Sequence, residues 1–265
     1  MTFFCNSLNS RTRWFLHTLT VVLLFCCAAI AQQVKPAAPL TADEVMARVV
    51  SMNDLRAKAL AGYSSVRTYH LESHGMIAKK ADMVVRADYS SPNKKDFAII
   101  SEGGSDTVRH KVFRRLLEAE QESMQDENQQ RSAIMPENYT FRLVSYEKTD
   151  QDEFYVLQAQ PRTKNKFLFR GRIWVDAKDF AITRVEGEPA VNPSWWTKKT
   201  DFTRTYKKVG DFWLPQANES VTVVRIVGTA VLTIKYQDYE ITQASGDKLT
   251  LVRDQSQGLS TPSTP

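Results

Sequence analysis

The sequence predicts a mainly β (α+β) fold, in which a curved antiparallel sheet forms an unclosed β-barrel covered by two or so α-helices. First, residues 167–239 contain strand-like runs separated by short turns at 176–179 and 209–211. Second, roughly ten such runs follow one another along the chain, at the spacing of antiparallel strands. Third, only the segments 41–62 and 107–127 show long helical periodicity. Because a sheet of about ten strands must curl or close, the two helices can cover its concave face.

The composition of the 265-residue chain is that of a globular protein, with 42% hydrophobic and 25% charged residues. We expect a signal peptide over residues 1–31, a Pro/Ala linker over 32–40, a single half-barrel domain over 41–245 and a polar, disordered tail over 246–265. The formal net charge of +5 is too small to indicate a nucleic-acid partner.

The first residues have the pattern of a secretory signal. Arg11 and Arg13 precede a largely apolar run over 14–30, and an Ala-x-Ala site ends at Ala31. The apolar run is interrupted and shorter than the roughly 20 residues that a spanning helix needs. We therefore expect export to the periplasm of a bacterial cell envelope, with cleavage near Ala31.

All three cysteines, Cys5, Cys26 and Cys27, lie inside this expected signal peptide. The mature chain would therefore hold no disulfide, no cysteine nucleophile and no cysteine-bound zinc. Lipidation of Cys26 or Cys27 stays open, although Phe25 and Cys26 stand where a lipoprotein signal prefers a small residue.

The first helix is predicted to begin with a capping box, in which Thr41 caps the helix and Glu44 reaches back. Val45 and Val49 begin its apolar stripe, and Gly62 lies where a terminator would stand. Strands are predicted next, over 65–77, 81–89 and 96–101.

Three side chains that could bind a metal, His70, Glu72 and His74, alternate along the first predicted strand and so share one face. A metal-dependent enzyme is one interpretation of this pattern. The opposite face carries Tyr69 and Leu71, so a solvated outer face is the other, and we expect no metal.

The second helix, over 107–127, has one apolar stripe that includes Val112, Phe113 and Leu116. Gly103 and Gly104 flank it on one side and the polar stretch 127–131 on the other. It is either a fixed cover of the core or a lid that opens at these flanks.

The second half of the sheet is predicted to begin with a hairpin of strands over 138–147 and 153–160. In the next run Phe167, Phe169 and Ile173 share one face. In the last predicted strand Leu232 and Ile234 point to one side. Residues 221–227 are apolar on both faces, which predicts a strand covered on both sides.

No catalytic motif is present: the chain lacks G-x-S-x-G, H-E-x-x-H, C-x-x-C and the dinucleotide-binding glycine pattern. We therefore expect no enzyme and no cofactor. Aromatic residues are frequent on the predicted sheet, and some of them could line an apolar cavity rather than fill the core. Such a cavity would bind acyl chains or apolar peptide segments.

The runs GRIWVDAKDFAITRVEG (171–187) and YKKVGDFWLP (206–215) resemble exported bacterial proteins of the LolA-like outer-membrane lipoprotein-sorting superfamily. The resemblance extends loosely over 41–239. It implies an unclosed β-barrel with helices over its mouth, and it implies that the protein carries lipoprotein acyl chains, binds other lipids or senses envelope stress. It also implies a lid-locking arginine, which no motif assigns to one of the strand arginines Arg67, Arg86, Arg142, Arg170, Arg172, Arg184, Arg204 and Arg225.

Together these observations predict a soluble, non-enzymatic periplasmic carrier of lipid acyl chains or lipoproteins, which exchanges its cargo with envelope donor or acceptor proteins. The alternative is an envelope regulatory module that binds a protein partner with the same sheet. The residues expected to line the apolar cavity and the lid are Val112, Phe113, Leu116, Phe167, Phe169, Ile173, Leu232 and Ile234.

Overall fold

The computed structural model describes residues 39–76, 78–192, 197–225, 228–245 and 248–254. The expected signal peptide, most of the linker, Trp195, Trp196 and the end of the tail lie outside the described residues.

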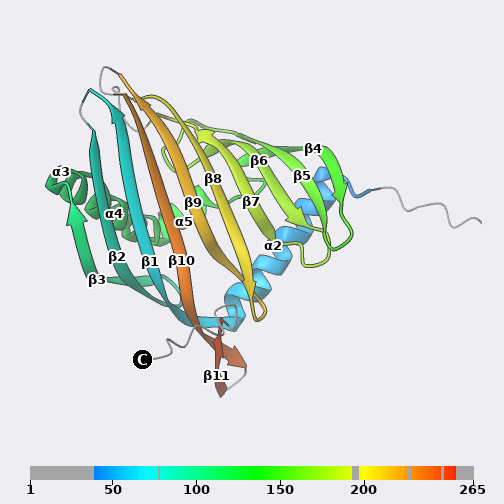
Figure 1. Ribbon diagram of the computed structural model, residues 1–265. Helices are drawn as coiled ribbons and strands as arrows, with labels where there is room; N and C mark the ends of the chain where they lie inside the picture. The colour runs from blue at the N-terminus through cyan, green and yellow to red at the C-terminus, as the bar shows by residue number, and fades with distance from the viewer. Residues whose placement is uncertain (1–38, 77, 193–196, 226–227, 246–247, 255–265) are drawn as a thin grey trace, which may run out of the picture. The chain divides into compact units, whose positions relative to one another are not determined.

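The strands form one antiparallel sheet that does not close into a barrel, as the sequence predicts (Figure 1). Eleven strands are described, against roughly ten expected from their spacing. Their order across the sheet is β3-β2-β1-β10-β9-β8-β7-β6-β5-β4, and β11 pairs with β10. The strands are β1 (Leu60–Gly75), β2 (Lys79–Ser90), β3 (Lys94–Gly104), β4 (Tyr139–Lys148), β5 (Glu153–Pro161), β6 (Phe169–Asp176), β7 (Ile182–Pro189), β8 (Thr197–Val209), β9 (Phe212–Val224), β10 (Gly228–Ser245) and β11 (Lys248–Arg253).

The pairing of β1 with β10 joins the two halves of the sheet. Their register places Arg67 opposite Tyr236 and Tyr69 opposite Ile234. The odd-numbered residues of this part of β1 are buried, whereas His70, Glu72 and His74 are partly or fully exposed. The sheet therefore has one face under the helices, which we call the helix-covered face, and one outer face.

All described helices lie over one face of the sheet (Figure 1). Helix α2 (Ala42–Ala59) begins with the predicted capping box: Thr41 Oγ1 accepts from the Glu44 amide, and the Thr41 amide donates to the Glu44 carboxylate. The helix ends at Ala59 and β1 begins directly at Leu60. The prediction that Gly62 ends the helix is therefore wrong, because Gly62 belongs to the strand.

The predicted helix over 107–127 forms in three consecutive pieces, α3 (Asp106–Val108), the π-helical η2 (Arg109–Phe113) and α4 (Arg114–Ser123). A further helix, α5 (Asp126–Ser132), includes the polar stretch 127–131 that follows the predicted helix. Asp126 and Glu127 in its first turn and Arg131 in its last suit the helix dipole.

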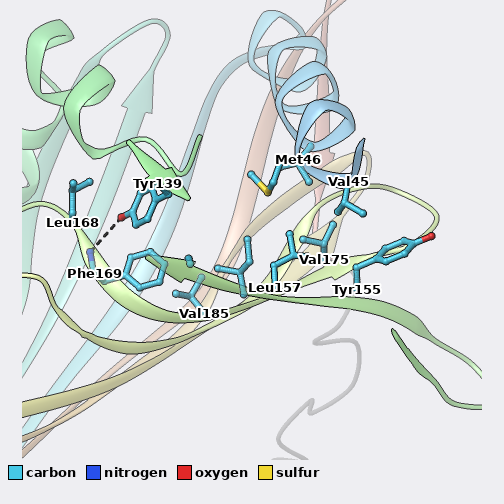
Figure 2. Packing of buried hydrophobic residues seen from close by; sticks show 12 residues of the cluster. Val45, Met46, Tyr139, Tyr155, Leu157, Leu168, Phe169, Val175 and Val185 are labelled. Carbon is cyan, nitrogen blue, oxygen red and sulfur yellow. Dashed lines mark hydrogen bonds between the residues drawn. The ribbon is translucent and has the colours of Figure 1, made fainter. Parts of the chain in front are cut away.

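Two buried clusters lie on the helix-covered face. In the first, Val45 and Met46 of α2 pack against Leu157, Val175 and their neighbours on β4–β7 (Figure 2). In the second, Phe113 of η2 and Leu117 of α4 pack against β1, β2 and β10. The two helical segments thus cover different halves of the sheet.

Two other expectations are corrected. The tail expected to be disordered from 246 includes β11, whose residue Val252 packs against a third cluster around Tyr239 and Phe212. Residues 221–224 are half-buried rather than covered on both faces, because the helices cover only one side of the sheet.

Candidate functional site

One carboxylate of helix α4 binds two cations of the sheet. Glu120 accepts a 2.7 Å hydrogen bond from Nη1 of Arg67 on β1 and another of 2.7 Å from Nζ of Lys95 on β3. The side chain of Arg67 is only 1% exposed and that of Lys95 only 9%. We call these three residues the Glu120 latch.

Aromatic rings surround both cations of the latch. The Arg67 guanidinium lies over the rings of Phe97 and Tyr236, and Lys95 lies over the ring of Tyr63. Ring faces attract cations, most strongly where water is excluded. Hydrogen bonds and ring faces therefore hold both charges between α4 and the sheet.

The electrostatics of the latch favour its charged form. Burial alone would raise the pKa of Glu120, but the charges of Lys95 and Arg67 outweigh it and hold that pKa below its ordinary value. Burial would lower the pKa of Lys95, yet the net direction is upward because of Tyr63 and Glu120. The latch is therefore ionised at neutral pH.

A first cavity of about 490 Å³ lies between α2, the segment 133–135 and the sheet. Its walls are mainly apolar, with polar groups of Asn53, Asp54 and Arg56 on the α2 side. The Arg56 guanidinium donates through Nη2 to the carbonyl of Asp179, while its buried Nη1 has no hydrogen-bond partner. The lining residues are Val50, Asn53, Asp54, Arg56, Ala57, Leu60, Ala133, Ile134, Met135, Ala181, Ile182, Tyr206, Phe212, Trp213 and Leu214.

A second cavity, of about 350 Å³, lies beside the first, and Ile134 lines both. Its walls combine apolar side chains with the two cationic residues Lys166 and Arg204. Lys166 pairs with Glu122 at 2.9 Å. The lining residues are Ser123, Ser132, Ile134, Lys166, Phe167, Leu168, Phe169, Val185, Pro189, Phe202 and Arg204.

The structure does not bring the eight predicted site residues together. Phe167 and Phe169 line the second cavity. Ile173 is fully buried in the cluster under α2. The remaining five all belong to, or pack against, the cluster under η2 and α4, namely Val112, Phe113, Leu116, Leu232 and Ile234.

Sequence reasoning missed the residues that connect the helices to the sheet. The sequence pattern singles out neither Glu120 nor the segment 133–135. Arg67 and Arg204 were two of eight equivalent strand arginines. The structure distinguishes them, since Arg67 is buried and paired whereas Arg204 is exposed and lines a cavity.

The candidate metal ligands lie on the outer face. Nδ1 of His70 is 2.6 Å from the carboxylate of Asp82, and Nε2 of His70 and of His74 each lie 3.9 Å from Glu72. Within the described ranges, no group of three or more His, Cys, Asp or Glu side chains is arranged to hold a metal ion.

In the same part of the chain, no helix has both the length and the apolar character needed to cross a membrane.

No protein-family model and no curated protein matches the chain. Solved structures are similar to it. An outer membrane lipoprotein-sorting protein domain from Vibrio parahaemolyticus is 13% identical, with a TM-score of 0.40, covering 75% of this chain and 93% of that one. A LolA superfamily protein from Nitrosomonas europaea is 10% identical, with a TM-score of 0.34 and coverages of 76% and 93%. The MucA/MucB complex structure from Pseudomonas aeruginosa gives 9% identity, a TM-score of 0.25 and coverages of 71% and 93%.

These similarities are low in identity and in TM-score, so they identify no ligand, partner or activity for this chain. The chain is similar to solved structures of the LolA superfamily and of an outer membrane lipoprotein-sorting domain, which are the proteins that the sequence runs at 171–187 and 206–215 resemble.

Proposed function

We propose that the protein is a non-enzymatic carrier of the bacterial periplasm, which shelters an acyl chain of a lipid or lipoprotein between its helices and the helix-covered face. The observation that carries this proposal is the pair of neighbouring cavities, about 490 and 350 Å³, that share Ile134. Ligand pockets of proteins usually measure about 300–1,000 Å³ and are mostly apolar. The mainly apolar walls of the first cavity favour an alkyl chain over a polar metabolite.

The Glu120 latch supports a role for η2 and α4 as a cover that can open. It links α4 to the sheet through charges rather than through apolar packing alone. By its position under the cover, Arg67 fits the lid-locking arginine that the sequence resemblance implies. A π-helical turn such as η2 often marks a functional site within a helix.

Transfer of cargo needs only an affinity gradient. A carrier releases its ligand to an acceptor that binds it more tightly, and opening of the cover governs how fast this happens. Envelope proteins that donate or accept the lipid are therefore the expected partners. The chain itself would perform no covalent chemistry.

Titration of the purified chain with a fluorescent long-chain fatty acid tests this proposal. We expect saturable binding at one molecule or so per chain, and competition by unlabelled lipid. Absence of saturable binding would contradict the proposal.

A second candidate function is binding of a protein partner by the same sheet, as a regulatory module of the envelope. One observation favours it: the edge strand β3 exposes Ile99 and Ile100, and among the described strands β3 pairs only with β2. Free strand edges can accept an added strand from a partner. A stoichiometric protein partner whose binding is lost in an Ile100→Lys variant would favour this function over the carrier.

A further inference from the structure

Arg204, on the helix-covered face, differs from Arg67 in its solvent exposure and in its partners. Arg204 lies on β8 opposite the buried Val185 of β7, and lines the second cavity beside Phe202. Its side chain is exposed to solvent although it lies on the face that the helices cover. Among the described residues, no carboxylate forms an ion pair with it, whereas the cavity's other cation, Lys166, is paired with Glu122.

The surroundings of Arg204 are aromatic rather than acidic. Tyr206 contributes most to raising the pKa of Arg204 and outweighs the opposing effect of burial, with smaller contributions from Tyr236 and Glu120. Glu120 itself is already bound by Arg67 and Lys95. The guanidinium therefore keeps a full positive charge that no carboxylate of the described residues neutralises.

An uncompensated cation in a cavity that has both polar and apolar walls favours an amphipathic anion. Arginine binds carboxylates through two parallel hydrogen bonds, and such pairs strengthen where water is excluded. One free positive charge balances a singly charged carboxylate, whereas a phosphate monoester carries about −1.5 to −2 charges near neutral pH. The rings of Phe167, Phe169 and Phe202 line the cavity beside it and would contact an alkyl chain.

We propose that the second cavity binds a long-chain fatty acid, with its carboxylate held by Arg204 and its alkyl chain along Phe167, Phe169 and Phe202 toward Ile134. This inference rests on the carrier function proposed above, and adds to it the charge of the headgroup. Because Ile134 lines both cavities, a chain too long for the second one can continue into the first.

The test compares two ligands of equal chain length, hexadecanoate and hexadecanol, each titrated into the full purified chain below its aggregation limit. The chain is expected to bind the carboxylate at least tenfold more tightly than the alcohol. Arg204→Gln is expected to remove this preference while leaving the affinity for the alcohol unchanged. Arg204→Lys keeps the charge without the fork geometry and should retain part of the preference.

The matched control is Arg172→Gln, which removes the same charge from an exposed position on the outer face of β6. It should leave both affinities unchanged. If the unaltered chain binds both ligands equally, or if Arg172→Gln abolishes the preference as well, the Arg204 site is wrong while the carrier function stands. If neither ligand binds, the carrier function fails too. Should Arg204→Gln not fold, a reduced preference in the folded Arg204→Lys variant would support the site, and an unchanged preference would contradict it.

Discussion

Nη1 of Arg67 on β1 donates a 2.7 Å hydrogen bond to the Glu120 carboxylate on α4, and this bond joins the sheet to the helix that covers it. The arginine is 1% exposed and the glutamate 28% exposed. A buried cation that loses its partner is strongly destabilising, because its desolvation is then uncompensated. Loss of either partner is therefore expected to destabilise the packing of α4 on the sheet.

Glu120→Gln is expected to lower the free energy of unfolding by roughly 3–5 kcal/mol, because it leaves Arg67 and Lys95 buried without a carboxylate. Urea denaturation monitored by circular dichroism measures this change. The matched control is Glu118→Gln on the same helix, whose exposed side chain should contribute less than about 0.5 kcal/mol. Equal effects of the two variants would show that the latch contributes nothing specific.

The latch also predicts a pH dependence at acid pH. Because the folded state holds the pKa of Glu120 below its ordinary value of 4.5, the stabilisation is present above that value. It is lost as the pH falls through the lowered folded-state pKa. The difference in unfolding free energy between the unaltered chain and Glu120→Gln should therefore be constant from pH 7 to about pH 5 and shrink below pH 4.5. A constant difference down to pH 2.5 or so would contradict this account.

Filling the first cavity should block an alkyl chain without breaking the core. Ala57 of α2 lines this cavity and its side chain is exposed, so Ala57→Phe places a ring in the open space with little strain. We expect the affinity for a fluorescent fatty acid to fall at least tenfold while the melting temperature stays within a few degrees. Ala47→Phe, at an exposed position of α2 outside the cavity, is the control and should leave binding unchanged.

Leu116 tests whether the cluster under α4 is a packed core or part of a binding surface. It is partly buried against Phe113, Leu117 and their neighbours, and it lines neither cavity. Leu116→Gln should therefore lower the free energy of unfolding by roughly 2–4 kcal/mol. The folded fraction should bind the fatty acid normally. A loss of affinity at unchanged stability would instead place a ligand under α4.

Periodicity predicted the sheet well, because alternation records which face is buried. Phe169, Ile173 and Val175 are buried and Arg170 and Arg172 exposed, as their spacing indicates. The capping box at Thr41 could also be predicted from the sequence, because all of its atoms lie within one helical turn. Local patterns of this kind depend on neighbouring residues only.

The site was not predictable in the same way, because its contacts join distant parts of the chain. Arg67 and Glu120 are 53 positions apart, and nothing near either residue in the sequence identifies its partner. Ile134 lies in a short connection, and only the folded arrangement places it between two cavities. The strand β11 was missed because residues 248–253 are a short run within an otherwise polar end of the chain, and they pair with β10 through the backbone.

Native mass spectrometry of the protein purified from its own cell envelope tests the carrier function most directly. The account predicts a protein species with a bound acyl lipid, which is released when the protein is denatured and is depleted in the Ala57→Phe variant. Protein that carries no lipid, and that also fails to bind an added fluorescent fatty acid, would contradict the account.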